Sequence, residues 1–135
     1  MPDKNTLQFL SIEDVKRLHD LSIARYGGSY GVRDERLLAS AIRMPEQTFD
    51  GIDLHLTLGA KAAAYLFHLC QNHAFLDGNK RVGLLACEAF LHLNEHELKL
   101  TSKEAEELML QVADGILSKE KLIAILEMSI QRLLR

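Results

Sequence analysis

The stretch "NHAFLDGNKRVGLLACEAFL", residues 72–91, combines a turn sequence with the start of an apolar helix. The helix is predicted to begin near Asn79, and its first turn carries two adjacent cations, Lys80 and Arg81. A helix N-terminus is electropositive, so each cation is expected to cost up to about 1 kcal/mol there. A bound anion would reverse this cost, because free backbone N–H groups, the helix dipole and both side chains would converge on it. The stretch therefore predicts a phosphate site, with solvated surface cations as the alternative.

On either side of this loop lie two segments that are apolar on nearly all faces, residues 56–70 and residues 82–93. Helices of this kind are normally buried at the centre of a domain. The loop is therefore expected to be held between two core helices, which makes it a rigid place for a functional site.

Upstream of this pair the sequence predicts two further helices. Ser11 is the predicted N-cap of the first, with Asp14 in the capping-box position, and residues 26–31 end it in a loop. Asp34 is predicted to cap the second, which stops near Pro45. The apolar face predicted for the first helix consists of Ile12, Val15, Leu18 and Leu21.

Strand signals are few. Residues 45–54 are predicted to form a small hairpin or flap, because the Asp-Gly pair at 50–51 favours a type I′ turn. A short strand is predicted at residues 98–100, and Ser102 and Ser118 are the predicted N-caps of the last two helices. The sequence thus predicts an all-α bundle of about six or seven helices with a small β-hairpin flap.

The composition is that of one ordinary globular domain covering residues 1–135, with 47% hydrophobic and 26% charged residues. The formal net charge of −3 gives no global attraction to nucleic acid or anionic lipid, so neither DNA nor a membrane is an expected partner. Cys70 and Cys87 lie in apolar helical patterns, which is typical of free thiols in a reducing cytosol. With no leader and no membrane-length apolar run, the protein is expected to be cytoplasmic.

Three residues of the loop carry further chemistry. Asp77 precedes the helix by two residues, where a carboxylate beside bound phosphate is a natural Mg²⁺ ligand, or else complements the helix dipole. His73 ends the preceding helix, and its imidazole is a candidate general base for a hydroxyl that attacks a phosphoryl group. A simple helix-capping role is the alternative for His73. Phe75 is predicted to be a structural anchor that pins the loop to the core.

Two zinc hypotheses are disfavoured. His68, Cys70 and His73 lie close in sequence, but a helix directs His68 away from the other two, and zinc needs three or four convergent ligands. The stretch "HLNEH", residues 92–96, fits the inverted zinc-protease pattern H-x-x-E-H. It lies where the core helix is expected to end, so the required helical geometry is doubtful there.

The stretch "HAFLDGNKR", residues 73–81, resembles the signature of the Fic/Doc family, H-x-F-x-(D/E)-(G/A)-N-(G/K)-R. Residues 31–51 are similar to the segment that leads into the flap in the Doc (death-on-curing) branch, and the resemblance as a whole covers roughly residues 9–100. It implies an all-α Fic fold with a β flap, and transfer of a phosphate-containing group from a nucleotide to a protein hydroxyl.

The resemblance also implies roles for individual residues. His73 matches the catalytic base, and Asp77 matches the acid that binds Mg²⁺. Gly78, Asn79 and Arg81 match the residues that form the anion hole for the nucleotide phosphates.

Departures from the adenylylating members favour the Doc branch. Those members have Gly where this chain has Lys80, and a second Arg where this chain has Leu84. Lysine adds bulk and a point charge, and losing the arginine removes a bidentate phosphate clamp. The pattern resembles the branch that binds ATP in the reversed sense and transfers its γ-phosphate, which makes it a protein kinase. Two smaller departures, Ala74 for Pro and Val82 for Thr, touch no named catalytic role.

The Doc resemblance further implies a toxin of a toxin–antitoxin system that modifies a translation factor similar to elongation factor Tu and so inhibits translation. No segment of the 135 residues fits the inhibitory pattern (S/T)-x-x-x-E-(G/N) of some Fic proteins. Inhibition is therefore expected from a cognate antitoxin, whose helical tail would lie in an apolar groove.

Two other functions remain open. A Fic-type adenylyltransferase would use the same fold and the same base but would transfer the α-phosphate with its nucleoside. A non-catalytic module would bind a nucleotide or a partner without turnover, although the intact His73, Asp77, Asn79 and Arg81 argue against it.

Overall fold

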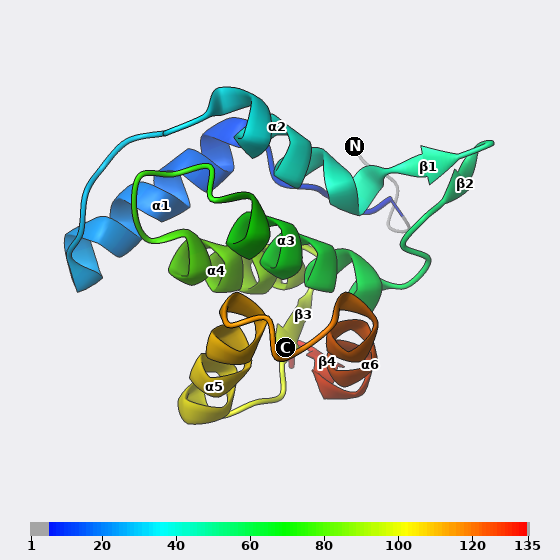
Figure 1. Cartoon of the computed structure of the whole chain (residues 1–135). Coiled ribbons are helices and arrows are strands. Elements are labelled where there is room, and N and C mark those ends of the chain that lie inside the picture. The colour runs from blue at the N-terminus through cyan, green and yellow to red at the C-terminus, as the bar shows by residue number, and fades with distance from the viewer. Residues whose placement is uncertain (1–5, 135) are drawn as a thin grey trace.

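The computed structural model describes residues 6–134, which form a helical bundle around one central pair of helices. α3 and α4 form this pair, α1 and α2 pack on one side of it, and α5 and α6 pack on the other (Figure 1). The predicted all-α bundle is confirmed, and no helix in the described range is long and apolar enough to cross a lipid bilayer. The helices are α1 (Ile12–Tyr26), α2 (Glu35–Arg43), α3 (Leu58–Asn72), α4 (Asn79–Leu93), α5 (Ser102–Ala113) and α6 (Lys119–Ser129), with a 3-10 turn at Met44–Glu46.

The central helices approach closely where α4 has a glycine. α3 is itself rich in small buried residues, with alanines at positions 60 and 62–64. On α4, a Cβ at Gly83 would lie 3.0 Å from the backbone oxygen of Leu66 on α3. Any larger side chain at position 83 would push the two helices apart, which would also separate the two ends of the loop between them.

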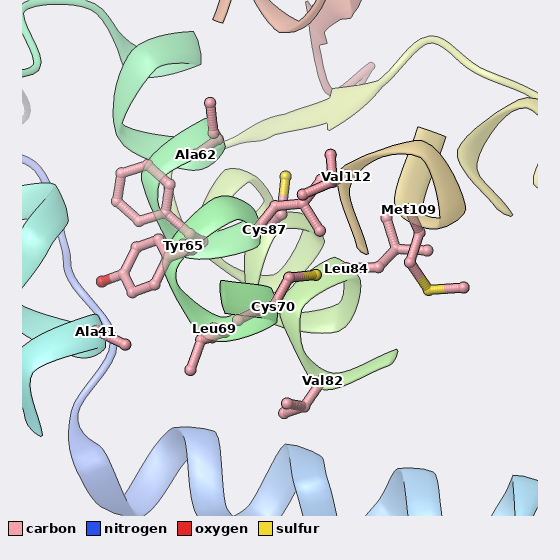
Figure 2. Close-up of a cluster of buried hydrophobic side chains, with 14 of the residues drawn as sticks. Ala41, Ala62, Tyr65, Leu69, Cys70, Val82, Leu84, Cys87, Met109 and Val112 are labelled. Atoms are coloured by element: carbon pink, nitrogen blue, oxygen red, sulfur yellow. The ribbon is translucent and has the colours of Figure 1, made fainter. Parts of the chain in front are cut away.

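Larger side chains fill the core around this contact (Figure 2). Tyr65 and Phe90 are fully buried with ring centroids 5.1 Å apart, and the Tyr65 hydroxyl accepts a hydrogen bond from the Leu10 N–H (2.9 Å). Cys70 and Cys87 are free and buried, as predicted. Burial raises the pKa of the Cys70 thiol to about 12, so this sulfur remains protonated and unreactive at neutral pH.

Most of the predicted helix starts are confirmed. Ser11 and Asp14 form a reciprocal capping box, in which the Ser11 hydroxyl accepts the Asp14 N–H (3.1 Å) and the Asp14 carboxylate accepts the Ser11 N–H (2.9 Å). The Asp34 carboxylate caps α2, and the Ser118 hydroxyl caps α6. The sequence pattern therefore located these starts from local hydrogen-bonding capacity alone.

One start was predicted one residue too late. α5 is capped by Thr101, and Ser102 is its first residue, because Glu104 completes a capping box only with position 101. α4 begins at Asn79, as predicted, and its N-cap is Gly78 in the left-handed region (φ 73°). The side chain of Asn79 is used elsewhere in the loop, as described below.

The face predicted for α1 was partly wrong. Leu21 is 66% exposed, and the fully buried positions include two polar residues, His19 and Ser22, together with Val15 and Ile23. These positions follow a helical spacing, but the stripe is rotated toward the loop between α3 and α4. Hydrophobicity alone missed the rotation because polar groups occupy the part of the stripe that meets this loop.

Two small antiparallel sheets complete the fold. β1 (Thr48–Phe49) and β2 (Ile52–Asp53) form the predicted hairpin, and positive φ angles at Asp50 (51°) and Gly51 (76°) fit its tight turn. The second sheet pairs β3 (His96–Leu98) with β4 (Ile130–Arg132). The strand predicted at 98–100 thus lies at 96–98 and shares only Leu98 with the prediction. The last helix ends at Ser129, because the chain continues from there as β4 and pairs with β3.

A buried lysine fixes the hairpin to the core. The Lys61 side chain on α3 is only 4% exposed, and its ammonium group donates to the Asp53 carboxylate (3.1 Å) and to the His55 carbonyl. The side chains at the tip bury little, since Phe49 is 71% and Ile52 is 65% exposed. The position of the hairpin is therefore set from its base.

Acid is expected to destabilise the fold partly through His68. The Lys119 ammonium group on α6 lies 2.9 Å from His68 Nε2 and donates a hydrogen bond to it. Burial, followed by the charge of Lys119, lowers the pKa of His68 from 6.5 to about 4. Between these values the unfolded chain binds a proton that the folded chain does not bind. The free energy of unfolding therefore falls as pH falls through this window.

A His68→Gln variant keeps an acceptor for Lys119 but cannot titrate. Between about pH 7 and about pH 5 the wild type is expected to lose about 1 kcal/mol more than this variant, after allowance for partial exposure. Urea unfolding at both pH values measures the difference. Equal losses in the two proteins would contradict the assigned cause.

Candidate active site

The loop between α3 and α4 lines a cleft of about 410 Å³. This volume falls within the range of small-molecule sites. The opposite wall comes from the end of α1, through Ser22, Ile23 and Tyr26. Six of the seven residues singled out by the sequence line the cleft, namely His73, Asp77, Gly78, Asn79, Lys80 and Arg81.

The hairpin lies elsewhere. Among the described residues, none from 45–54 lines the cleft. The hairpin precedes the N-terminus of α3, whereas the loop follows its C-terminus (Figure 1). α3 has 15 residues, so about 22 Å of helix separates the two features.

His73 is the residue at which the chain leaves α3. It takes the left-handed conformation (φ 50°, ψ 46°) that ends many helices, and its side chain is exposed at the cleft. Its carbonyl oxygen accepts a hydrogen bond from Arg33 Nε (2.8 Å). The backbone of His73 is thereby fixed while its imidazole stays accessible to a substrate.

The segment after α1 holds the middle of the loop. The Ala74 carbonyl accepts the N–H groups of Arg33 (2.7 Å) and Asp34 (3.0 Å), and the Leu76 N–H donates to the Gly31 carbonyl (3.1 Å). Phe75, the seventh residue singled out, is 2% exposed, and its ring stacks on His19 at a centroid distance of 3.9 Å. This burial is the arrangement expected of a structural anchor.

Asn79 fastens the end of the loop. Its side-chain Oδ1 accepts the Phe75 N–H (2.9 Å), and its Nδ2 donates to the Phe75 carbonyl (3.0 Å). The first helical hydrogen bond of α4 runs from the Val82 N–H to the Gly78 carbonyl (3.0 Å). The N–H groups of Asn79 and its two successors precede this bond and point out of the helix end, where an anion can accept them.

Asp77 presents a carboxylate that is already oriented. Its Oδ1 accepts the Gly78 N–H (2.8 Å), and its Oδ2 accepts the Ser29 N–H (3.1 Å). Each oxygen keeps a further lone pair, and the side chain is exposed at the cleft. One oriented carboxylate next to phosphate-binding N–H groups fits Mg²⁺ shared with a nucleotide, since Mg²⁺ takes one or two carboxylates plus phosphate oxygens.

The two cations differ in a way that the sequence did not predict. Arg81 is not without a partner, because it forms a two-pronged ion pair with Glu106 on α5 (2.7 and 3.1 Å) and lies over the Tyr26 ring at 4.5 Å. The charge of Arg81 is therefore already compensated within the fold, whereas the sequence predicted that a bound anion would compensate it. Glu106 uses two of the five guanidinium N–H groups, so three remain for an anion.

Lys80 is the exposed cation of the pair, and it lines the cleft. The pKa of the Glu106 carboxyl is lowered, first by its hydrogen bond with Arg81 and least by the charge of Lys80. Glu106 is therefore ionised at neutral pH and offsets part of the positive charge at the start of α4. A nucleotide with several negative charges would still meet a net attraction from two cations and the helix end.

Sequence reasoning missed the cleft wall from α1 and two residues that contact the loop from other helices, His19 and Glu106. His19 could have been noticed, because it lies with Ser22 in the buried stripe of α1 and polar residues on a buried face need partners. No local signal identified Glu106, which is 25 residues from its partner Arg81.

The zinc hypotheses find no support in the described part of the chain. Within residues 6–134 no group of three or more His, Cys, Asp or Glu side chains is placed to hold a metal ion. His68 faces Lys119, whereas His73 faces the cleft. His96 lies on β3, beyond the end of α4.

Comparison with known proteins places the chain in a family. The model of the Fic/DOC family matches residues 9–91, and the chain belongs to this family. It is 44% identical over 108 residues to the Toxin Doc of Mycolicibacterium smegmatis (strain ATCC 700084 / mc(2)155), covering 78% of this chain and 81% of that protein. It is 32% identical over 112 residues to the Protein kinase doc of Escherichia phage P1, covering 83% of this chain and 87% of that protein. The helical bundle with its small hairpin is thus a Fic fold.

Proposed function

We propose that this chain is an ATP-dependent protein kinase of the Doc type, which transfers the γ-phosphate of ATP to a Ser or Thr hydroxyl of a translation factor similar to elongation factor Tu. The observation that carries the proposal is the shared cleft, where an exposed imidazole, an oriented carboxylate and the open end of a core helix meet. The relative from Escherichia phage P1, named a protein kinase, supports the same chemistry.

In this proposal each residue has one task. His73 removes the proton of the attacking hydroxyl, whose oxygen bonds to the γ-phosphorus while the bond to the β–γ bridging oxygen breaks and ADP leaves. The N–H groups at the start of α4, with Lys80 and Arg81, hold the phosphate oxygens in line for attack. Asp77 would hold Mg²⁺, which neutralises charge on those oxygens when bound.

Position 84 favours phosphoryl transfer over adenylylation. The adenylylating members of the family that this sequence resembles have an arginine clamp at this position. In this chain Leu84 is 5% exposed and packs within the core cluster that also contains Met109 (Figure 2). No cation extends from this position into the cleft. A Leu84→Arg exchange would force a guanidinium into the core, so the clamp is not restored by one substitution.

The target is proposed to dock at more than one place. Its hydroxyl must reach His73, while the exposed tip residues Phe49 and Ile52 offer a separate contact at the other end of α3. A protein target can span the intervening distance of about 22 Å, whereas a short peptide cannot do so easily. Whole folded protein is therefore the substrate to test.

The proposed biological role is that of a toxin in the cytoplasm, held inactive by a cognate antitoxin with a helical tail. The relative from Mycolicibacterium smegmatis, named Toxin Doc, supports this role. The sequence also contains no segment that fits the inhibitory pattern of some Fic proteins, so we assign inhibition to a second chain.

The test is an intact-mass assay of elongation factor Tu after incubation with the chain, ATP and Mg²⁺, with parallel samples labelled at the γ- or the α-phosphate. A gain of one phosphate with γ-label alone is the expected result. A gain of adenylate with α-label would overturn the kinase assignment and favour the adenylyltransferase. Nucleotide binding without any modification of elongation factor Tu or of lysate proteins would favour the non-catalytic module.

A further inference from the structure

His19 is a buried histidine that belongs to neither the core nor the open cleft. It lies on α1, is 1% exposed, and places its Nε2 2.7 Å from the carbonyl oxygen of Asp77, 58 residues away in the sequence. A carbonyl oxygen only accepts, so Nε2 carries the proton and donates it. The Phe75 ring stacks on the face of the His19 imidazole, and the two ring planes lie within 10° of parallel.

His19 donates this hydrogen bond to a peptide unit whose orientation the local backbone does not fix. This unit joins the Asp77 carbonyl to the Gly78 N–H, and Gly78 has φ 73°. Glycine populates positive and negative φ almost equally, so the peptide plane can rotate at little cost unless something holds it. The same N–H donates to Asp77 Oδ1, so the direction of the peptide also sets the direction of the carboxylate.

We propose that His19 is a positioning residue, which locks the Asp77–Gly78 peptide and so orients the Asp77 carboxylate and the open end of α4 toward a Mg²⁺-bound nucleotide. The inference rests on the proposed function for its ligand. The residues fit the task, because a Cβ at Gly78 would lie in ordinary contact with His19 Nε2 at 3.6 Å, so the imidazole lies directly against this residue. Without His19 the Ser29 N–H would be the contact left to hold the carboxylate from the side of α1.

Two variants separate the hydrogen bond from the packing. His19→Phe keeps a ring against Phe75 and removes the donor, whereas His19→Gln places an amide N–H where Nε2 lies and removes the ring. A merely structural role predicts that the ring matters most. A positioning role predicts that the donor matters most. His19→Gln should then bind the nucleotide more tightly than His19→Phe, whereas a structural role predicts the reverse.

The first readout is the dissociation constant for ATP in the presence of Mg²⁺, measured by calorimetry on the full chain. His19→Phe is expected to weaken binding by about 10- to 100-fold, as is typical when the partner that orients a metal ligand is lost. His19→Gln is expected to recover most of the affinity. Equal affinities of His19→Phe and the wild type would overturn the inference, and failure of the wild type to bind would overturn the proposed function as well.

The second readout needs no variant and no ligand. The nitrogen chemical shifts of the His19 ring report which nitrogen carries the proton, and amide exchange reports whether the Gly78 N–H is protected. Protonated Nε2 with a protected Gly78 amide is expected in the wild type, with faster Gly78 exchange in His19→Phe. A ring protonated only at Nδ1 would overturn the inference even if the variants fail to fold.

Discussion

His73→Ala is expected to reduce the rate of phosphate transfer by about 10²- to 10⁴-fold, because no other described imidazole lines the cleft to take the proton of the attacking hydroxyl. The fold should survive, since His73 lies exposed at the end of α3 and its backbone contact with Arg33 does not involve the imidazole. Transfer of labelled γ-phosphate to elongation factor Tu measures the first effect, and thermal unfolding measures the second.

The left-handed backbone at residue 73 calls for a second variant. His73→Asn also lacks the base, but asparagine adopts positive φ more readily than alanine does. Both variants should be equally inactive, with His73→Asn the more stable of the two. Full transfer by either variant would remove His73 from the mechanism.

Gly28→Ala is expected to lower both the stability of the fold and the affinity for ATP with Mg²⁺. A Cβ at this position would lie 2.6 Å from Asp77 Oδ2, and the φ of 115° is unfavourable for any residue other than glycine. The strain should cost about 1–3 kcal/mol in the free energy of unfolding. Relief of the clash should also displace the Asp77 carboxylate, so affinity for ATP with Mg²⁺ should fall about tenfold or more.

Gly115→Ala is the matched control for backbone strain. Its φ is 73°, but a Cβ there would meet nothing within 4 Å, so the strain comes without a clash, and Gly115 itself does not line the cleft. It should lower stability without changing nucleotide affinity. An equal loss of affinity in both variants would show that strain, not the contact with Asp77, causes the effect.

The parts of this molecule that the sequence predicted are those governed by near neighbours. The capping box of Ser11 and Asp14, the break at Pro45 and the turn at Asp50–Gly51 depend on residues within one turn of each other. The two central helices were predicted from their own composition, which is apolar on nearly all faces. The meeting of His73 and residues 76–81 at one cleft was also predictable, because a short loop between two packed helices keeps its residues close together.

The parts that the sequence did not predict depend on contacts across the fold. Glu106 meets Arg81 only because α5 packs beside α4, and His19 meets Asp77 only because the buried stripe of α1 turns toward the loop. The pairing of β4 with β3 likewise joins segments more than thirty residues apart, as in His96 with Arg132. Hydrophobic periodicity carries no information about such partners.

The loop between α3 and α4 is held by hydrogen bonds from three sides, which limits how easily it can open. Backbone hydrogen bonds from the segment 31–34, the side chain of Asn79 and the imidazole of His19 would all have to break before the loop could open. Amide exchange in this loop should therefore require global unfolding, not a local fluctuation. For the proposed kinase, control would then come from a partner that covers the cleft and not from a rearrangement of this loop.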